Sequence, residues 1–116
     1  YGVFAQKAAP DNVDPHHVLV ADSVVSENEF GVRCARFCQV SRNDVSQNEA
    51  TGITISEGGG LVIANMVSYN GGYGLYVSEL TGVGDNTLVY NQLGQAFSTF
   101  IPLEPNACYP ACPPPP

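Results

Sequence analysis

Four cysteines carry the most distinctive chemistry in this chain, and they occur as two pairs with the same spacing. Cys34 and Cys38 form one pair, and Cys108 and Cys112 form the other. Such cysteines form disulfides in an oxidising compartment or hold zinc in a reducing one. Because the chain is acidic and has a single lysine, we expect a secreted or cell-surface protein with disulfides. The three possible pairings, within or between chains, stay open.

Histidine and acidic side chains are the next candidates for chemistry. His16 and His17 are adjacent, so their rings point apart and make a poor chelate. Two pairs of glutamates occupy matched positions and could share a calcium ion, but no dense aspartate motif accompanies them. We therefore expect solvated side chains here, with no bound metal and no cofactor. The glutamate pairs are Glu29 with Glu49 and Glu57 with Glu79.

Tyrosines form the third candidate group. Tyr69 and Tyr90 are predicted to share an outward column, with Tyr73 and Tyr76 nearby. An exposed aromatic group of this kind can stack on a sugar or on a partner subunit. It can equally be an aromatic ladder between neighbouring strands. The sequence leaves these interpretations open.

Composition excludes several classes of partner. The 116 residues carry a net charge of −7, with only four Lys and Arg residues. Nucleic-acid binding needs clustered basic side chains, and so does attraction to an anionic membrane surface. No apolar run approaches the length of a spanning helix. We expect neither a nucleic-acid partner nor membrane insertion.

An internal repeat of 20 to 22 residues organises the chain. Its pattern is Asn or Ser, then Val or Leu, then Asn, then Gly before a short apolar strand. Residues one repeat apart are predicted to stack as parallel β-neighbours. Asparagine suits this stacking because it tolerates left-handed backbone at a bend and can bond to its own copies. The aligned columns are Ser23, Asn43, Asn65 and Asn86; Asn28, Asn48, Asn70 and Asn91; and Gly31, Gly52, Gly74 and Gly94.

This repeat resembles that of the right-handed parallel β-helix proteins, the pectate-lyase-like superfold. The resemblance implies an all-β solenoid of about four to five turns over residues 1–97. Residues 98–116 form a Pro- and Cys-rich tail. We expect this tail not to continue a sheet ladder, because proline lacks the backbone donor.

Catalysis is the activity that the resemblance most directly suggests. Similar β-helix enzymes place acids, arginine and sometimes calcium on an outward sheet face. The corresponding outward positions here contain no carboxylate, so no acid–base pair can form there. We therefore favour a non-catalytic protein. The outward positions are predicted to be Phe4, Arg33, Thr54, Tyr76 and Ala96.

The predicted function is structural. A short solenoid leaves unpaired strand edges at both ends, and open edges recruit other chains. We expect copies to stack end to end into an extracellular filament or surface assembly. The alternatives are a carbohydrate-binding or polysaccharide-processing module and a fragment of a larger adhesin or phage fibre. The predicted interface residues are Gly2, Val3, Phe4 and Ala5 at one end and Gly94, Gln95, Ala96 and Phe97 at the other.

Overall fold

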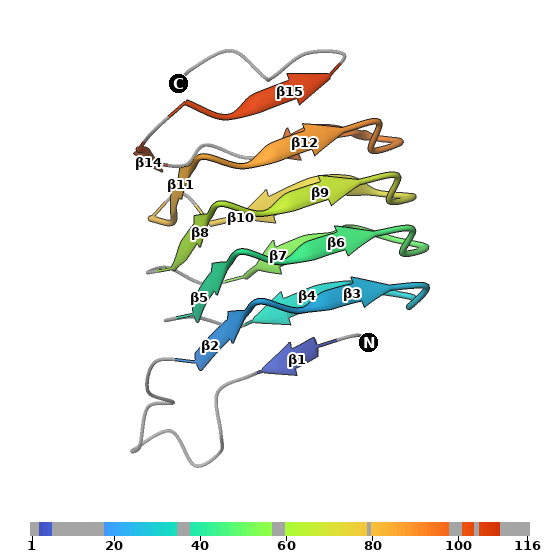
Figure 1. The fold of residues 1–116 in the computed structure, drawn as a ribbon, viewed down its shortest axis with the longest axis horizontal. Coiled ribbons are helices and arrows are strands. Elements are labelled where there is room, and N and C mark those ends of the chain that lie inside the picture. The colour runs from blue at the N-terminus through green and yellow to red at the C-terminus, as the bar shows by residue number, and fades with distance from the viewer. Residues whose placement is uncertain are drawn as a thin grey trace.

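The computed structural model of the chain is a parallel β-helix with three short strands in each complete turn (Figure 1). It describes residues 3–5, 18–34, 38–56, 60–78, 80–97, 101–103 and 105–109. About four turns lie above one another between β1 and β15. No helix occurs in these residues. The predicted all-β parallel solenoid is therefore confirmed.

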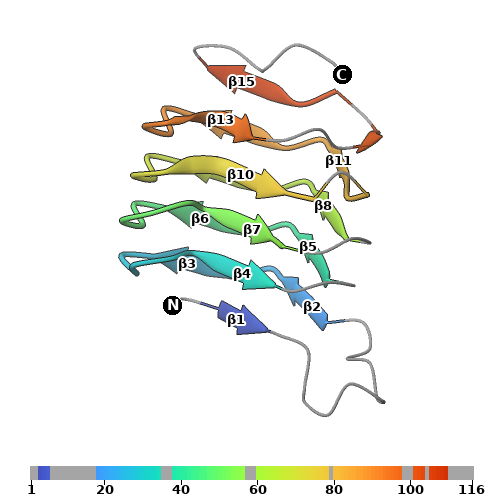
Figure 2. The same cartoon turned by 180° about the vertical axis from the view of Figure 1, so that it is seen from behind.

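Each turn contributes one strand to each of three parallel sheets, which we call sheets A, B and C. Sheet A, which faces the viewer in Figure 2, contains β1 (Val3–Ala5), β4 (Val32–Cys34), β7 (Ile53–Ile55), β10 (Tyr73–Val77) and β13 (Gly94–Phe97). Sheet B contains β2 (Val18–Ala21), β5 (Cys38–Ser41), β8 (Leu61–Ile63), β11 (Gly82–Gly84) and β14 (Ile101–Pro102). Sheet C contains β3 (Val24–Ser26), β6 (Asp44–Ser46), β9 (Met66–Ser68), β12 (Thr87–Val89) and β15 (Ala107–Tyr109).

The core is a set of vertical columns of small aliphatic side chains. In sheet C, the register pairs Val45 with Val67 and Val67 with Leu88. These side chains are 0–1% exposed. Compact β-branched residues suit this narrow interior because their stiff side chains pack well on a pleated surface. In β6 and β12, the residues on either side of this column are more exposed than the column residue, which gives these strands their alternating burial.

In each turn, two of the corners contain one residue with left-handed backbone each. These residues have φ between 51° and 61°, and each directly precedes a column residue, as Tyr69 precedes Asn70. The expectation that asparagine itself takes the left-handed conformation is therefore wrong. The asparagine side chain instead holds the bend by hydrogen bonding. The left-handed residues are Asp22, Arg42, Ala64 and Asp85 at one corner, and Glu27, Gln47, Tyr69 and Tyr90 at the other.

The β-helix continues past residue 97, so the expectation that the tail could not join a sheet is wrong. β14 pairs with β11, and β15 pairs with β12. The Ile101 N–H donates to the carbonyl oxygen of Thr81, just before β11, at 2.8 Å, and the Leu103 N–H donates to that of Val83 in β11 at 3.0 Å. Backbone groups alternate in direction along a strand, so the missing N–H of Pro102 falls on the outer edge. Proline is tolerated at such edge positions because no ladder bond is lost.

The last strand of sheet A is displaced by one residue from the predicted alignment. Leu75 pairs with Ala96, and Tyr76 pairs with Phe97. Phe97, rather than Ala96, therefore belongs to the column of Arg33, Thr54 and Tyr76. Gln95, rather than Gly94, follows Gly74 in the glycine column. The corrected column still contains no carboxylate.

Candidate functional site

Two ladders of buried asparagines run the length of the solenoid at its corners. In one, Asn48 donates both its backbone N–H and its side-chain amide to Oδ1 of Asn70, at 3.0 and 2.9 Å. Asn70 makes the same pair of bonds to Asn91 at 3.1 and 2.9 Å. Each amide also donates to a carbonyl oxygen of the preceding turn, as Asn70 does to Val45 at 3.1 Å. The amide therefore satisfies backbone groups that the bend would otherwise leave unpaired.

The second ladder repeats this chemistry and extends into the tail. Asn43 donates to Asn65, and Asn65 donates to Asn86, at 2.9 to 3.0 Å. Asn86 in turn donates to Oδ1 of Asn106 at 3.0 Å through both its N–H and its side chain. Asn106 was not predicted. Its spacing of 20 residues from Asn86 falls within the 20 to 22 residues of the earlier repeats and was the available signal.

Gln95 closes the first ladder at its C-terminal end. Its Oε1 accepts from the Asn91 amide at 2.8 Å, and its Nε2 donates to the Tyr109 carbonyl oxygen at 2.9 Å. Gln95 is 4% exposed. The longer side chain thus substitutes for the asparagine of a further turn and ties β13 to β15.

Glycine is required where the first ladder passes close to sheet A. A Cβ atom on Gly74 would lie 2.6 Å from the Gln95 carbonyl oxygen and 2.7 Å from the Asn91 amide nitrogen. Gly52 meets the Asn70 amide in the same way, at 2.8 Å. Real Cβ contacts are not this short, so the glycine column makes the space that the asparagine ladder occupies.

The predicted interface strands lie at opposite edges of sheet A. β1 is one edge strand, and β13 is the other. Sheets B and C end in β2 and β3 at the first edge and in β14 and β15 at the second. Val20 and Val25, in the first complete turn, retain 7% and 5% exposure, compared with 0% for Val40 in the next turn. Gly2 lies outside the described residues.

A disulfide joins Cys34, at the end of β4, to Cys38, at the start of β5. Their Cα atoms are 6.3 Å apart. Both residues are buried, so the bridge lies inside the β-helix and links sheets A and B at their corner. Cys108 on β15 is also disulfide-bonded. Cys112 lies outside the described residues.

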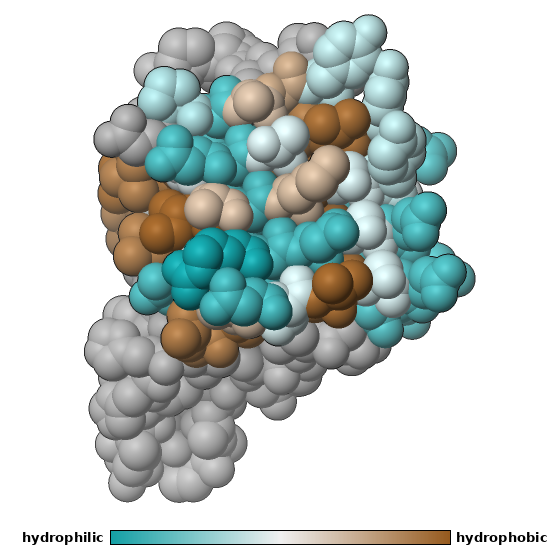
Figure 3. Space-filling model, in the orientation of Figure 1, coloured by the Kyte–Doolittle hydropathy of each residue, from teal (hydrophilic) through white to brown (hydrophobic). Residues whose placement is uncertain are grey.

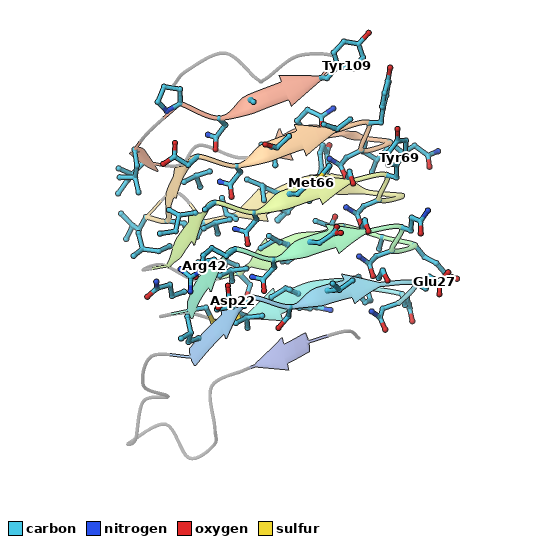
Figure 4. The ribbon with its side chains drawn as sticks, viewed as in Figure 1. Asp22, Glu27, Arg42, Met66, Tyr69 and Tyr109 are labelled. Atoms are coloured by element: carbon cyan, nitrogen blue, oxygen red, sulfur yellow. A yellow bond between two sulfur atoms is a disulfide. The ribbon has the colours of Figure 1, made fainter. Side chains whose placement is uncertain are left out.

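Three tyrosines stack at the corner between sheets C and A, on the side where Figure 4 labels Glu27, Tyr69 and Tyr109. The rings of Tyr69 and Tyr90 are 5.6 Å apart, and those of Tyr90 and Tyr109 are 5.0 Å apart and nearly perpendicular. A hydrogen bond to Tyr109 raises the pKa of Tyr90. Tyr73 and Tyr76 form a separate pair at 6.1 Å. Tyr109 was not predicted because it lies in the tail.

The outward face of sheet B has no charged side chain in its described strands. Leu61, Ile101 and Leu103 are 40–48% exposed, and Leu61 and Leu103 lie on either side of Gly82. Hydrophobic surface gathers on this side of the molecule in Figure 3.

Charged groups contribute one well-defined ion pair in the described chain. Arg42 binds both carboxylate oxygens of Asp22, at 2.9 and 3.3 Å, at the corner labelled in Figure 4. This pair lowers the pKa of Asp22, first through the hydrogen bond and then through the charge of Arg42. Both side chains are largely exposed.

No metal-binding cluster of three or more His, Cys, Asp or Glu residues is present in the part of the chain that the structure describes. Glu29 and Glu49 are exposed there. His16, His17, Glu57 and Glu79 lie outside the described residues. The same part of the chain contains no helix that could cross a membrane.

Comparison with protein families gives one match, to a model described as periplasmic copper-binding protein (NosD), over residues 11–99. Comparison with curated proteins gives no match. Comparison with solved structures gives none either. The family match covers most of the repeat region, which agrees with the parallel β-helix seen here.

The donor groups of the described residues do not fit copper. Copper favours thiolate, thioether and imidazole ligands. Cys34, Cys38 and Cys108 are all disulfide-bonded, and Met66 is the single methionine. A lone thioether does not make a site. The match over residues 11–99 and the shared architecture nevertheless establish the relationship: this chain belongs to the NosD family, a family of periplasmic β-helix proteins.

Proposed function

We propose that this chain is a non-catalytic structural protein that works outside the cytoplasm and associates end to end with copies of itself. The observation that carries the proposal is the shape of its two ends. β1 extends sheet A at one end, whereas β14 and β15 extend sheets B and C at the other. The β1 strand of a second copy would therefore fit beside β13 and complete a turn with β14 and β15.

Backbone hydrogen bonds would supply the attraction at such a joint. Edge strands present N–H and C=O groups that can pair with another chain. Residual exposure of Val20 and Val25 supports the same direction of association, because a further turn would cover them. The contact joins the two opposite ends of the stack, so it would propagate along the stack axis rather than close into a two-fold dimer.

Two features weaken the C-terminal side of the joint. Pro102 offers no N–H to a strand added beside β14. Gln95 already satisfies the asparagine ladder within the chain. These features favour short or reversible assemblies, since sheet B would contribute fewer bonds than sheets A and C.

The test is the association state of edge variants. Asp44 is the register partner of Val24, and its N–H donates to the Ser23 carbonyl oxygen, towards β3. The Val24 N–H points in the same direction along the stack and therefore lies on the outer edge of β3. Val24→Pro would remove that edge donor without breaking an internal ladder bond. Sedimentation velocity over a range of concentrations should show wild-type oligomers and mostly monomeric Val24→Pro.

Val24→Ala is the matched control, because it changes the same 73% exposed side chain but keeps the N–H. It should associate like the wild type, and Pro102→Ala should associate more strongly. A wild-type protein that stays monomeric at every concentration contradicts the proposal. Equal association of Val24→Pro and Val24→Ala contradicts the proposed joint.

Glycan binding is a second candidate, which the tyrosine column favours. Tyr69, Tyr90 and Tyr109 are 59%, 48% and 56% exposed, and exposed aromatic rings can bind sugars. The negative charge of the chain disfavours acidic glycans. Affinity electrophoresis with neutral polysaccharides tests this function, with Tyr69→Ala as the variant that should lose retardation. Unchanged migration of the wild type in every polysaccharide would exclude it.

A further inference from the structure

The tyrosine column at the corner between sheets C and A has a chemistry that assembly does not use. We propose that Tyr69, Tyr90 and Tyr109 form an oxidative cross-linking site. At this site, a haem peroxidase acting with hydrogen peroxide would join neighbouring turns of one chain through a dityrosine bond. The inference does not depend on end-to-end association.

Proximity is the first requirement for dityrosine formation, and the fold supplies it. The rings of Tyr90 and Tyr109 are 5.0 Å apart, and Tyr69 lies 5.6 Å from Tyr90. In sequence these residues are 19 and 21 positions apart. The stacking of successive turns therefore places the rings of residues that are distant in sequence next to each other.

The backbone holds the column in place. The Tyr69 N–H donates to the Val89 carbonyl oxygen at 3.0 Å, and the Tyr90 N–H donates to the Tyr109 carbonyl oxygen at 2.9 Å. Asn70 and Asn91, which follow the two tyrosines, are anchored in the buried ladder. The phenol rings are already held next to each other and need no diffusional encounter, which strongly favours reaction within the chain.

Access is the second requirement. About half of each tyrosine side chain in the column is exposed, so an oxidant can reach the phenols. The chain contains no tryptophan and one methionine. The described cysteines are already disulfide-bonded. Tyrosine is therefore the main target for one-electron oxidation on this surface.

Coupling transfers two electrons and two protons from a pair of phenols to hydrogen peroxide. Each of two phenols loses one electron and its hydroxyl proton and becomes a tyrosyl radical. The two radicals join through a carbon–carbon bond between ring positions ortho to the oxygens, and the two ring hydrogens move to the oxygens to restore the phenols. Hydrogen peroxide accepts the two electrons and two protons and becomes two water molecules. The product is lighter than the starting chain by two hydrogen atoms.

The test treats the folded chain, at low concentration, with a haem peroxidase and hydrogen peroxide. Dityrosine fluorescence should appear in the monomer fraction. Peptide mass spectrometry should identify a link from Tyr90 to Tyr109 or to Tyr69. Tyr90→Phe should lose this within-chain signal, because phenylalanine keeps the ring but cannot couple. Tyr76→Phe is the matched control, since Tyr76 is 43% exposed outside the column and should keep the signal.

Tyr109→Phe provides a second variant in case Tyr90→Phe fails to fold, and it should remove the link to Tyr109. Wild type unfolded in urea should lose most of the within-chain product, because proximity comes from the fold. The proposal is overturned if the folded wild type gives only links between chains. It is also overturned if the principal link joins Tyr73 to Tyr76, or if Tyr90→Phe retains the wild-type signal.

Discussion

At the scale of single residues, the asparagine side chain is the key to this fold. The asparagine amide offers an acceptor oxygen and two N–H donors on a short stem, so one side chain can serve two neighbouring turns. The repeat predicted the positions of Asn48, Asn65 and Asn70, because their spacing is regular. It did not predict their backbone conformation. The left-handed residue is the one before each asparagine, and its identity varies from Asp to Tyr.

Removing one amide from the middle of a ladder should destabilise the protein strongly. Asn70→Ala would leave the Asn48 donors and the Val45 carbonyl without their partner. Each buried polar group left unpaired costs about 1–3 kcal/mol. Urea unfolding should therefore show a loss of several such contributions.

Asn28→Ala is the matched control for that substitution. Asn28 is partly exposed, and its amide donates only to the Ser26 carbonyl oxygen at 3.0 Å. We expect a clearly smaller loss in the free energy of unfolding. Equal losses for the two variants would contradict the role given to the buried ladder.

The ion pair at the corner between sheets B and C gives a prediction for pH. Arg42 holds the pKa of Asp22 below its ordinary value of 3.8. A carboxyl whose folded pKa is depressed adds stability above its unfolded pKa and loses it as pH falls through the folded pKa. NMR titration of Arg42→Gln should show the Asp22 pKa rising towards 3.8, and an unchanged pKa would contradict the pairing. The effect on stability should be small because both side chains are exposed.

At the scale of elements, the strands were predicted well where the repeat letters are regular and poorly where they change. The last strand of sheet A was misplaced because the alignment followed the letter of Gly94. The structure instead keeps the distance from the asparagine, so Gln95 takes the glycine position. The tail strand β15 was missed because its Pro- and Cys-rich composition hid the repeat. The register of β13 and the place of β15 in sheet C follow only from contacts with the preceding turn.

Two glycine substitutions test the packing between the strands and the ladders. Gly74→Ala should be strongly destabilising, since the new Cβ would meet a backbone oxygen at 2.6 Å and a buried amide at 2.7 Å. Gly82→Ala is the control, because its nearest atoms are methyl groups of Leu61 and Leu103 at 3.0 Å, and these side chains are partly exposed and can move. Thermal unfolding should rank the variants in that order. The reverse order would contradict the close approach of ladder and sheet.

At the scale of the whole molecule, the protein is a stack of turns in which each contacts its neighbours. The fold class could be predicted because a solenoid repeats the same strands and bends in every turn, and this repeat is visible in the sequence. The surfaces could be predicted only in part. Tyr109 belongs to the tyrosine column only because the tail continues the stack. The disulfide between Cys34 and Cys38 forms because the corner between sheets A and B brings the two residues together.

Residues one repeat apart become hydrogen-bonded neighbours inside this molecule. Hydrogen exchange of the asparagine side-chain amides, followed by NMR in heavy water, tests this most directly. The amides of Asn48, Asn65, Asn70 and Asn86 should remain protected, while that of Asn28 exchanges faster. Rapid exchange of all five amides in the folded protein would contradict the stacked ladders and the β-helix built on them.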